Sequence, residues 1–447
     1  MLMSESQEIS LGQSADPQIM AAYGLYEDPQ IQKFIDAKGQ EMVKVSHRSN
    51  IKYEFKILDS PIVNAFAVPG GYVYFTRGIM AHFNNEAEFA GVLGHEIGHI
   101  AARHSAKQYS QATLAQIGLT LGAVFAPEQF SDFVNAANTG VSLLFLKFGR
   151  DDETESDRLG VEYSTKVGYN AIEMANFFKT INRLQEAAGA SIPTFLSTHP
   201  NPGDRYKEVT RLANKWQKQL NVSPTNLNIN RESYLQLVDG IVYGEDPRQG
   251  FFENNTFYHP DLKFYFPVPA NWQTMNSPTA VQMAPQDGNA LMVLQLSQSK
   301  TLKEAGEEFV NSNSLVVIES KNTTQHGKPV LKLLAKQEQT DANGAVIQTL
   351  MVLCHFVQHD GIIYQLYGLA LDENYNNYSN FFLNTLNNFK TLTDPNKLNR
   401  LPARLEVKSV PSATTLQKAL QLNGVGAGSL EEHAILNGMQ LSDQLAA

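Results

Sequence analysis

The residues best able to do chemistry in this chain lie in one short motif, HEIGH, at residues 95–99. Its two histidines, His95 and His99, are four residues apart, so on a helix they share a face and can reach a single metal ion. Glu96 projects about a quarter-turn away, where it can take a proton from a water molecule beside the metal. The motif therefore predicts a zinc-dependent hydrolase with Glu96 as its general base.

The surrounding sequence predicts the helix that this motif needs. Asn85 followed by Glu88 is typical of a helix start, with Asn85 as the N-cap and Glu88 reaching back to it. Apolar residues then recur at helical spacing and give the helix a buried face: Phe89, Val92, Leu93, Ile97 and Ile100. The helix also contains three glycines, which are Gly91, Gly94 and Gly98. Each glycine costs about 1 kcal/mol against alanine, so we expect either a close helix contact or a functional constraint there.

A zinc peptidase also needs a third protein ligand and an open position for water. The metzincin arrangement would require a glycine at position 102 and a histidine at position 105. This arrangement is excluded, because the chain has Ala102 and Ser105. His104 is one residue out of register, and we interpret it as a local structural residue rather than a ligand.

The alternative third ligand is a carboxylate that follows the motif. No Asp or Glu occurs between His99 and Glu128, and acidic residues then cluster at residues 151–157. On a helix Glu153 and Asp157 share a face, so one could bind metal while the other holds a ligand histidine through its second ring nitrogen. The same cluster is equally typical of a helix N-terminus, where acidic side chains favour the helix dipole.

Four motifs together resemble the HtpX/CAAX-prenyl-protease family of zinc metallopeptidases, and most closely its soluble bacterial branch outside the cytoplasm. They are NAFAVPGGYVY at residues 64–74, HEIGHIAARHS at 95–105, ETESDRLG at 153–160 and STHP at 197–200. The resemblance covers about residues 5–215. That family is of the gluzincin type, so the resemblance implies that His95, His99 and Glu153 bind one zinc ion. It also implies that Glu96 is the general base.

The resemblance assigns further roles at positions that match the family's motifs. Asp157 would orient a ligand histidine. His199 matches the His-Pro motif and Arg205 the basic residue after it, so we expect His199, helped by Arg205, to stabilise the tetrahedral oxyanion. Two alternatives for His199 stay open. It could be a turn residue before Pro200, or it could occupy the fourth position of the zinc and hold the enzyme latent.

A small sheet is predicted before the metal motif. Residues 51–57 alternate apolar and charged side chains, as a half-buried strand does, and residues 63–68 and 72–76 flank a Pro-Gly-Gly turn. Asn64 and Ala65 resemble the gluzincin edge strand that pairs with an extended substrate. A substrate that binds as an added strand is recognised through its backbone rather than its side chains. This mode of binding predicts broad specificity and a preference for unfolded segments. The alternative is that Asn64 merely ends a strand.

Composition limits the partners and the compartment. The formal charge of −10 argues against nucleic acid as a partner. The one cysteine, Cys354, permits no internal disulfide, and its strand-like context predicts a buried thiol. No signal peptide is visible at Met1, so an exported protein would have lost its leader. The resemblance nevertheless implies an extracytoplasmic bacterial enzyme that is periplasmic or associated with the cell envelope.

The predicted fold class is α+β, with several domains in 447 residues. A mainly helical zincin-type metallopeptidase domain with a small edge sheet occupies residues 1–215, and a helical linker follows at 216–255. Hairpin signals then predict an antiparallel α+β accessory domain at 256–398. Residues 399–447 form a small tail module, whose abrupt end suggests that it is incomplete.

Two further features are interpreted as structural. Residues 114–126 are apolar, but thirteen residues are too few to cross a bilayer. With residues 141–148 they predict a helical hairpin near the active site. His355 and His359 are four apart on a predicted strand, where this spacing does not build the helical metal pair, so we predict no second metal site there.

These patterns favour a zinc endopeptidase that hydrolyses unfolded or misfolded extracytoplasmic proteins. The alternative is a latent or chaperone-like zinc-binding protein that acts mainly through its accessory domains. The intact base, Glu96, favours the enzyme, because a protein that keeps zinc only for its shape does not need it.

Overall fold

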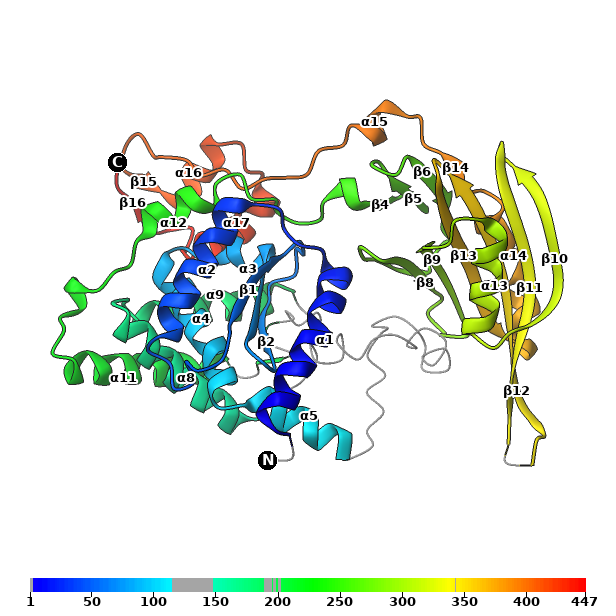
Figure 1. Ribbon diagram of the computed structural model, residues 1–447. Coiled ribbons are helices and arrows are strands. Elements are labelled where there is room, and N and C mark those ends of the chain that lie inside the picture. The colour runs from blue at the N-terminus through cyan, green and yellow to red at the C-terminus, as the bar shows by residue number, and fades with distance from the viewer. Residues whose placement is uncertain (1–2, 115–147, 189–194, 196–197, 200–201, 342) are drawn as a thin grey trace. The chain divides into compact units, whose positions relative to one another are not determined.

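The protein is described from a computed structural model that covers residues 3–114, 148–188, 195, 198–199, 202–341 and 343–447 (Figure 1). The described residues form two compact units. The first unit contains those up to Glu245 together with Ala403–Ala447, and the second contains Asp246–Pro402. Most of the predicted linker and tail therefore packs with the first unit. The predicted hairpin at 114–126 and 141–148 falls almost entirely outside the described residues.

The first unit is mainly helical, as predicted. Its helices are α1 (Glu5–Tyr23), α2 (Pro29–Val43), α3 (Arg77–His82), α4 (Glu86–Ala101), α5 (His104–Leu114), α8 (Arg150–Lys166), α9 (Ile172–Ala188), α11 (Pro202–Gln219) and α12 (Arg231–Val238). They enclose a three-stranded sheet in the order β1-β3-β2, made of β1 (Glu54–Leu58), β2 (Ala65–Val68) and β3 (Tyr72–Thr76). The β2–β3 hairpin is confirmed, and its turn needs Gly70 and Gly71, whose φ angles are +87° and +103°.

Helix α4 carries the HEIGH motif and is buried over nearly its whole length. The predicted N-cap is confirmed, because Asn85 Oδ1 accepts the Glu88 backbone N–H at 2.8 Å. The predicted return contact is wrong by one residue: the Glu88 carboxylate accepts the N–H of Asn84, at 2.7 Å, instead of that of Asn85. The apolar stripe of α4 packs into the main core of the unit, so the helix is held by burial on every side.

The glycines of α4 are explained by close helix contacts. A Cβ added at Gly94 would lie 2.9 Å from the carbonyl oxygen of Gly160 on α8, and one at Gly91 would lie 2.4 Å from Cβ of Met174 on α9. A Cβ at Gly98 would meet Ser156 and Leu159 of α8 at 3.2–3.3 Å. The backbones of α4 and α8 therefore approach each other directly, and this contact brings the acidic cluster of α8 to the histidines of α4.

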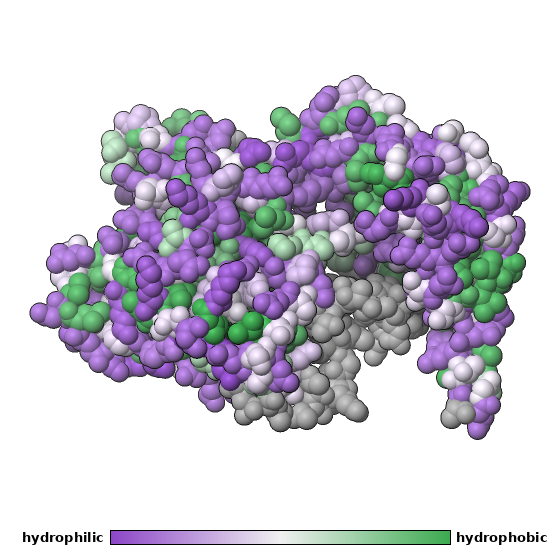
Figure 2. Space-filling view, viewed as in Figure 1, coloured by the Kyte–Doolittle hydropathy of each residue, from purple (hydrophilic) through white to green (hydrophobic). Residues whose placement is uncertain are grey.

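The second unit is an antiparallel α+β domain, as predicted. Its larger sheet has the order β10-β11-β12-β13-β9-β8-β7 and its smaller sheet the order β14-β6-β5-β4. The strands are β4 (Phe251–Glu253), β5 (Thr256–His259), β6 (Phe264–Pro267), β7 (Gln273–Asn276), β8 (Ala280–Ala284), β9 (Ala290–Ser297), β10 (Val316–Gln325), β11 (Lys328–Thr340), β12 (Val346–His359), β13 (Ile362–Leu371) and β14 (Lys390–Thr391). The helices are α13 (Leu302–Ser312), α14 (Asp372–Leu386) and α15 (Pro395–Leu398). Exposed hydrophobic residues include Val316, Val317 and Ile318 on the edge strand β10 and Val346 and Ile347 at the start of β12. Figure 2 shows hydrophobic side chains on the surface of this unit.

Alternation along the strands of the larger sheet builds two cores. Leu331 and Cys354 face α13, whereas their neighbours Val330 and Leu353 face α14 and the smaller sheet. Cys354 is fully buried, which confirms the predicted core thiol. The ring nitrogens of His355 and His359 contact different backbone carbonyls, those of Leu386 and Lys263.

The C-terminal segment packs against the other parts of the first unit. It contains β15 (Thr414–Thr415), α16 (Leu416–Leu422), α17 (Leu430–Leu436) and β16 (Gln444–Leu445). Arg183 of α9 donates to the Glu431 carboxylate at 2.8 Å and to the Met439 carbonyl at 2.7 Å. Across the described residues, no helix combines the length and the apolar character that a membrane span needs.

Candidate metal centre

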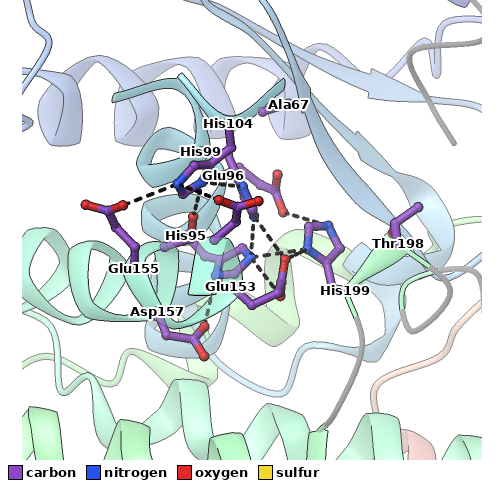
Figure 3. Close-up of polar contacts among 12 residues, drawn as sticks. Ala67, His95, Glu96, His99, His104, Glu153, Glu155, Asp157, Thr198 and His199 are labelled. Atoms are coloured by element: carbon purple, nitrogen blue, oxygen red, sulfur yellow. Dashed lines mark hydrogen bonds and ion pairs between the residues drawn. The ribbon is translucent and has the colours of Figure 1, made fainter. Parts of the chain in front are cut away.

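Two helices, α4 and α8, and the segment before α11 bring four potential metal ligands together (Figure 3). The Nε2 atoms of His95 and His99, both on α4, lie 2.9 Å apart, and Glu153 Oε1 on α8 lies 3.3 Å from His99 Nε2. His199, in the segment before α11, has Nδ1 2.9 Å from Glu153 Oε1 and 3.3 Å from His95 Nε2. The four ligand atoms lie within 4.8 Å of one another, so they can converge on a single ion.

The chemistry of these donors fits zinc. Three imidazoles and one carboxylate are ligands that tetrahedral zinc accepts. All four side chains are buried, and His199 Nε2 makes no hydrogen bond within the described part of the chain. Buried polar atoms in native proteins are normally paired, so this nitrogen is consistent with a site built for a bound group.

Asp157 stands directly behind one of the ligands. Its Oδ1 lies 2.9 Å from His95 Nδ1, so it can accept the proton of the nitrogen that does not face the metal position. Arg205 holds the same carboxylate, with Nε donating to Oδ2 at 2.8 Å and Nη2 donating to Oδ1 at 2.6 Å. Arg205 Nη1 lies 2.9 Å from Glu153 Oε2. Any help that Arg205 gives to His199 therefore passes through Glu153, which both side chains contact.

Glu96 lies beside the four potential ligands and is completely buried. Neither of its carboxylate oxygens has a hydrogen-bond partner among the described residues, and Oε1 lies 3.6 Å from His199 Nε2. Burial raises the pKa of Glu96, although the nearby His199 and His95 partly oppose this. A buried carboxylate with a raised pKa is suited to taking and holding a proton.

Two of the potential ligands, Glu153 and His99, are held in forms that can bind metal. Burial would raise the pKa of Glu153, but the positive charges of His199 and Arg205 outweigh it and hold that pKa well below its usual value. Burial also holds the pKa of His99 well below its ordinary value, so its imidazole is neutral. An ionised carboxylate and a neutral imidazole are the protonation states that metal binding requires.

Comparison with known families identifies this part of the chain. Residues 29–213 match the family model of Peptidase family M48. The chain contains an M48 peptidase domain. Its HEIGH helix, its acidic helix and His199 all lie within the matched region, and members of this family are zinc metallopeptidases.

Several curated proteins are similar over the same region. The putative beta-barrel assembly-enhancing protease of Vibrio cholerae is 32% identical over 196 residues, which are 42% of this chain and 40% of that protein. The mitochondrial metalloendopeptidase OMA1 of Arabidopsis thaliana is 33% identical over 184 residues, 40% of this chain and 36% of that protein. The beta-barrel assembly-enhancing protease of Escherichia coli K12 is 28% identical over 224 residues, 48% of this chain and 45% of that protein. The chain thus spans less than half the length of these relatives.

The residues proposed for substrate binding, Asn64 and Ala65, are both buried and lie at the edge of the M48 domain's small sheet. β2 is an edge strand, and the Asn64 carbonyl accepts the Thr76 N–H on the β3 side. The Val63 carbonyl instead accepts the Phe195 N–H, and the Ala67 carbonyl accepts the Ser105 hydroxyl. Because backbone groups alternate along a strand, those of Ala65 also face the outer edge.

Sequence reasoning missed the aromatic side chains of the M48 site. The ring of Phe148 stacks on His99 with centroids 4.0 Å apart, and Phe195 stacks on His199 at 4.8 Å. The apolar run that ends at Phe148 was the only available signal, and it does not say which ring would reach the histidines. These aromatic rings make the surroundings of the ligands apolar, which strengthens electrostatic interactions within the site.

Proposed function

We propose that this chain is a zinc metalloendopeptidase that hydrolyses unfolded or misfolded proteins outside the cytoplasm, in a bacterial periplasm or envelope. One observation carries the peptidase proposal: the buried Glu96 carboxylate lies beside His95, His99 and Glu153 and accepts no hydrogen bond from any described residue. The relatives are named as proteases and endopeptidases, which supports the same reaction. The relatives named for beta-barrel assembly support an envelope location, whereas those named as mitochondrial belong to another compartment.

The proposed chemistry divides between the ion and the chain. Bound to His95, His99 and Glu153, zinc would lower the pKa of a water molecule to about 7 and polarise the scissile carbonyl. Glu96 takes the proton of the attacking water and passes it to the leaving amine. The raised pKa of Glu96 suits this task, because the carboxyl must hold the proton between the two steps.

We propose that substrate binds as an extra strand beside β2. The outward backbone groups of Ala65 would pair with an extended peptide, while the carbonyls of Val63 and Ala67 on either side are already occupied. The Asn64 side-chain oxygen is buried and has no hydrogen-bond partner among the described residues, so it is available to a substrate N–H. Recognition of backbone over so short a stretch favours unfolded segments of any sequence.

A second candidate function rests on His199. Its Nδ1 belongs to the group of potential ligands, and its Nε2 faces Glu96. If His199 held the fourth position, zinc would have no place for water, and the protein would be latent or would act as a chaperone-like zinc protein through its accessory domains. We propose that this arrangement is a resting state, and that His199 moves toward the oxyanion position when substrate binds.

Cleavage of casein, an unstructured protein, by the zinc-loaded full chain tests these proposals. Glu96→Gln should keep zinc bound and abolish cleavage. Glu88→Gln, a buried glutamate on the same helix but away from the histidines, is the matched control and should still cut. If only His199→Ala cuts, the unmodified protein is latent. If no variant cuts although zinc is bound, the peptidase proposal is wrong and suppression of casein aggregation becomes the assay.

A further inference from the structure

We propose that His104 is a positioning residue that orients the zinc ligand His99 and sets its tautomer. The inference rests on the proposed zinc site. His104 is not among the potential ligands, yet its Nδ1 lies 3.1 Å from Nδ1 of His99, on the side of that ring opposite the metal position. Figure 3 shows His104 between His99 and Glu155.

A break between two helices puts His104 in this place. In a continuous helix, a residue five positions after His99 would be turned about 140° away from it. Instead α4 ends at Ala101, and Arg103 adopts a left-handed conformation with a φ of +60°. Helix α5 then begins at His104 itself. The reversal turns the imidazole of His104 back onto the ring of His99.

The N-terminal helix α1 holds this strained turn. A left-handed residue other than glycine costs about 1 kcal/mol, so it persists only when its surroundings hold it. Arg103 Nε donates to the Glu8 carboxylate of α1 at 2.7 Å. Arg48 donates to both oxygens of Glu8 and also to the carbonyl of Ile100 in the last turn of α4. The buried Glu8 therefore ties the end of α4 and the turn together.

The hydrogen-bonding chain assigns the protons. For His99 to bind metal through Nε2, its Nδ1 must carry a proton and needs an acceptor. His104 Nδ1 can accept only if the proton of His104 lies on Nε2. That atom faces two carboxylates, Glu155 Oε2 at 3.4 Å and Asp152 Oδ1 at 3.6 Å. The hydroxyl of Ser156 also lies 3.2 Å from His104 Nδ1 and is a second polar group beside that atom.

The two ligand histidines of α4 are therefore supported in different ways. His95 is backed by the carboxylate of Asp157, whereas His99 is backed by a neutral imidazole whose far side faces two carboxylates. His104 is only 3% exposed, so water cannot easily replace it. Removing it would leave the Nδ1–H of His99 buried without an acceptor.

A matched pair of variants tests this role in the full chain. His104→Leu and His104→Asn have side chains of the same branched shape, but only the asparagine can place an acceptor oxygen near the position of Nδ1. Competition with a chelator gives the zinc dissociation constant, and thermal unfolding of the zinc-free protein reports on the fold. We expect His104→Leu to weaken zinc binding about 10- to 100-fold and His104→Asn to recover most of the loss. His47→Leu, a half-exposed histidine of the same unit, is the control and should bind zinc normally.

The outcomes separate this proposal from the proposed function. If the unmodified protein binds no zinc, both are wrong. If it binds and cleaves but His104→Leu binds zinc equally well, or if the Leu and Asn variants are weakened alike, only the positioning role is refuted. Should His104→Leu fail to fold, Glu155→Ala replaces it, because that side chain is 49% exposed. It should weaken zinc binding about threefold without changing the unfolding of the zinc-free protein, and an unchanged affinity would refute the role.

Discussion

Replacing Gly160 by alanine should move the metal ligands of α4 and α8 apart without altering any ligand residue. The added Cβ would lie 2.8 Å from the backbone nitrogen of His95 and 3.2 Å from the Gly91 carbonyl oxygen. These are backbone atoms of a buried helix, so they cannot rotate away. Comfortable contacts begin near 3.4 Å, and α4 and α8 must therefore separate by about half an ångström.

This displacement predicts two measurable losses. Overpacking costs about 1–3 kcal/mol, whereas the higher helix propensity of alanine stabilises the helix by about 1 kcal/mol. The free energy of unfolding of the Gly160→Ala protein should therefore fall by about 1 kcal/mol. Metal–ligand distances tolerate only about 0.2 Å, and α8 carries Glu153 while α4 carries the histidines. Zinc affinity should therefore fall about tenfold or more, a larger effect than the loss of stability suggests.

Urea unfolding followed by circular dichroism and chelator competition for zinc measure the two effects. Gly149→Ala is the matched control, because that glycine directly precedes the same helix and the nearest atom to its added Cβ is 3.7 Å away. It should bind zinc normally. If Gly160→Ala folds and binds zinc as tightly as the control, the close approach of α4 and α8 does not set the ligand geometry.

Three further predictions concern the rest of the fold. Burial raises the pKa of Glu88 to about 8, so the folded state prefers the protonated carboxyl, and stability should fall as pH rises from about 4.5 to about 8. Glu88→Gln keeps an acceptor for the Asn84 N–H but cannot ionise. It should therefore be more stable than the unmodified protein at pH 9 by about 1–3 kcal/mol, and no more stable at pH 4.5. Thermal unfolding at both pH values checks this. Asn85→Ala removes the N-cap of α4 and should cost about 1 kcal/mol in urea unfolding, whereas an unchanged midpoint would mean that the cap adds nothing. The Cys354 thiol is fully buried and its pKa is raised, so a thiol reagent at pH 8 should label it only after urea unfolds the second unit; rapid labelling of the native protein would contradict its core position.

Elements that depend on neighbours in sequence were predictable. The N-cap of α4, its apolar stripe and the Pro-Gly-Gly hairpin each follow from residues a few positions apart, and the structure confirms them. The one error, at Glu88, is also local. The Glu88 carboxylate accepts the N–H of Asn84 instead of that of Asn85, and capping patterns do not distinguish two adjacent donors.

The sequence determined one part of the metal centre, and the tertiary structure determined the other. By itself the sequence determined that His95 and His99 share a helical face with Glu96 beside them, because the period of the helix requires it. It also limited the third ligand to the acidic cluster, within which the resemblance favoured Glu153. Spacing could not distinguish that ligand from a helix N-terminus, since the cluster lies more than fifty residues along the chain from the motif.

Only the tertiary structure decided what stands behind and around these ligands. The glycine contact of α4 with α8 places Glu153 at the histidines, the turn at Arg103 brings His104 back to His99, and Arg205 faces carboxylates instead of His199. Each of these contacts depends on how two helices approach or how a chain reverses. Sequence periodicity predicts which face of a helix or strand is buried, but not which other element packs against that face. Packing depends on the shape and charge of segments that are far apart in the chain.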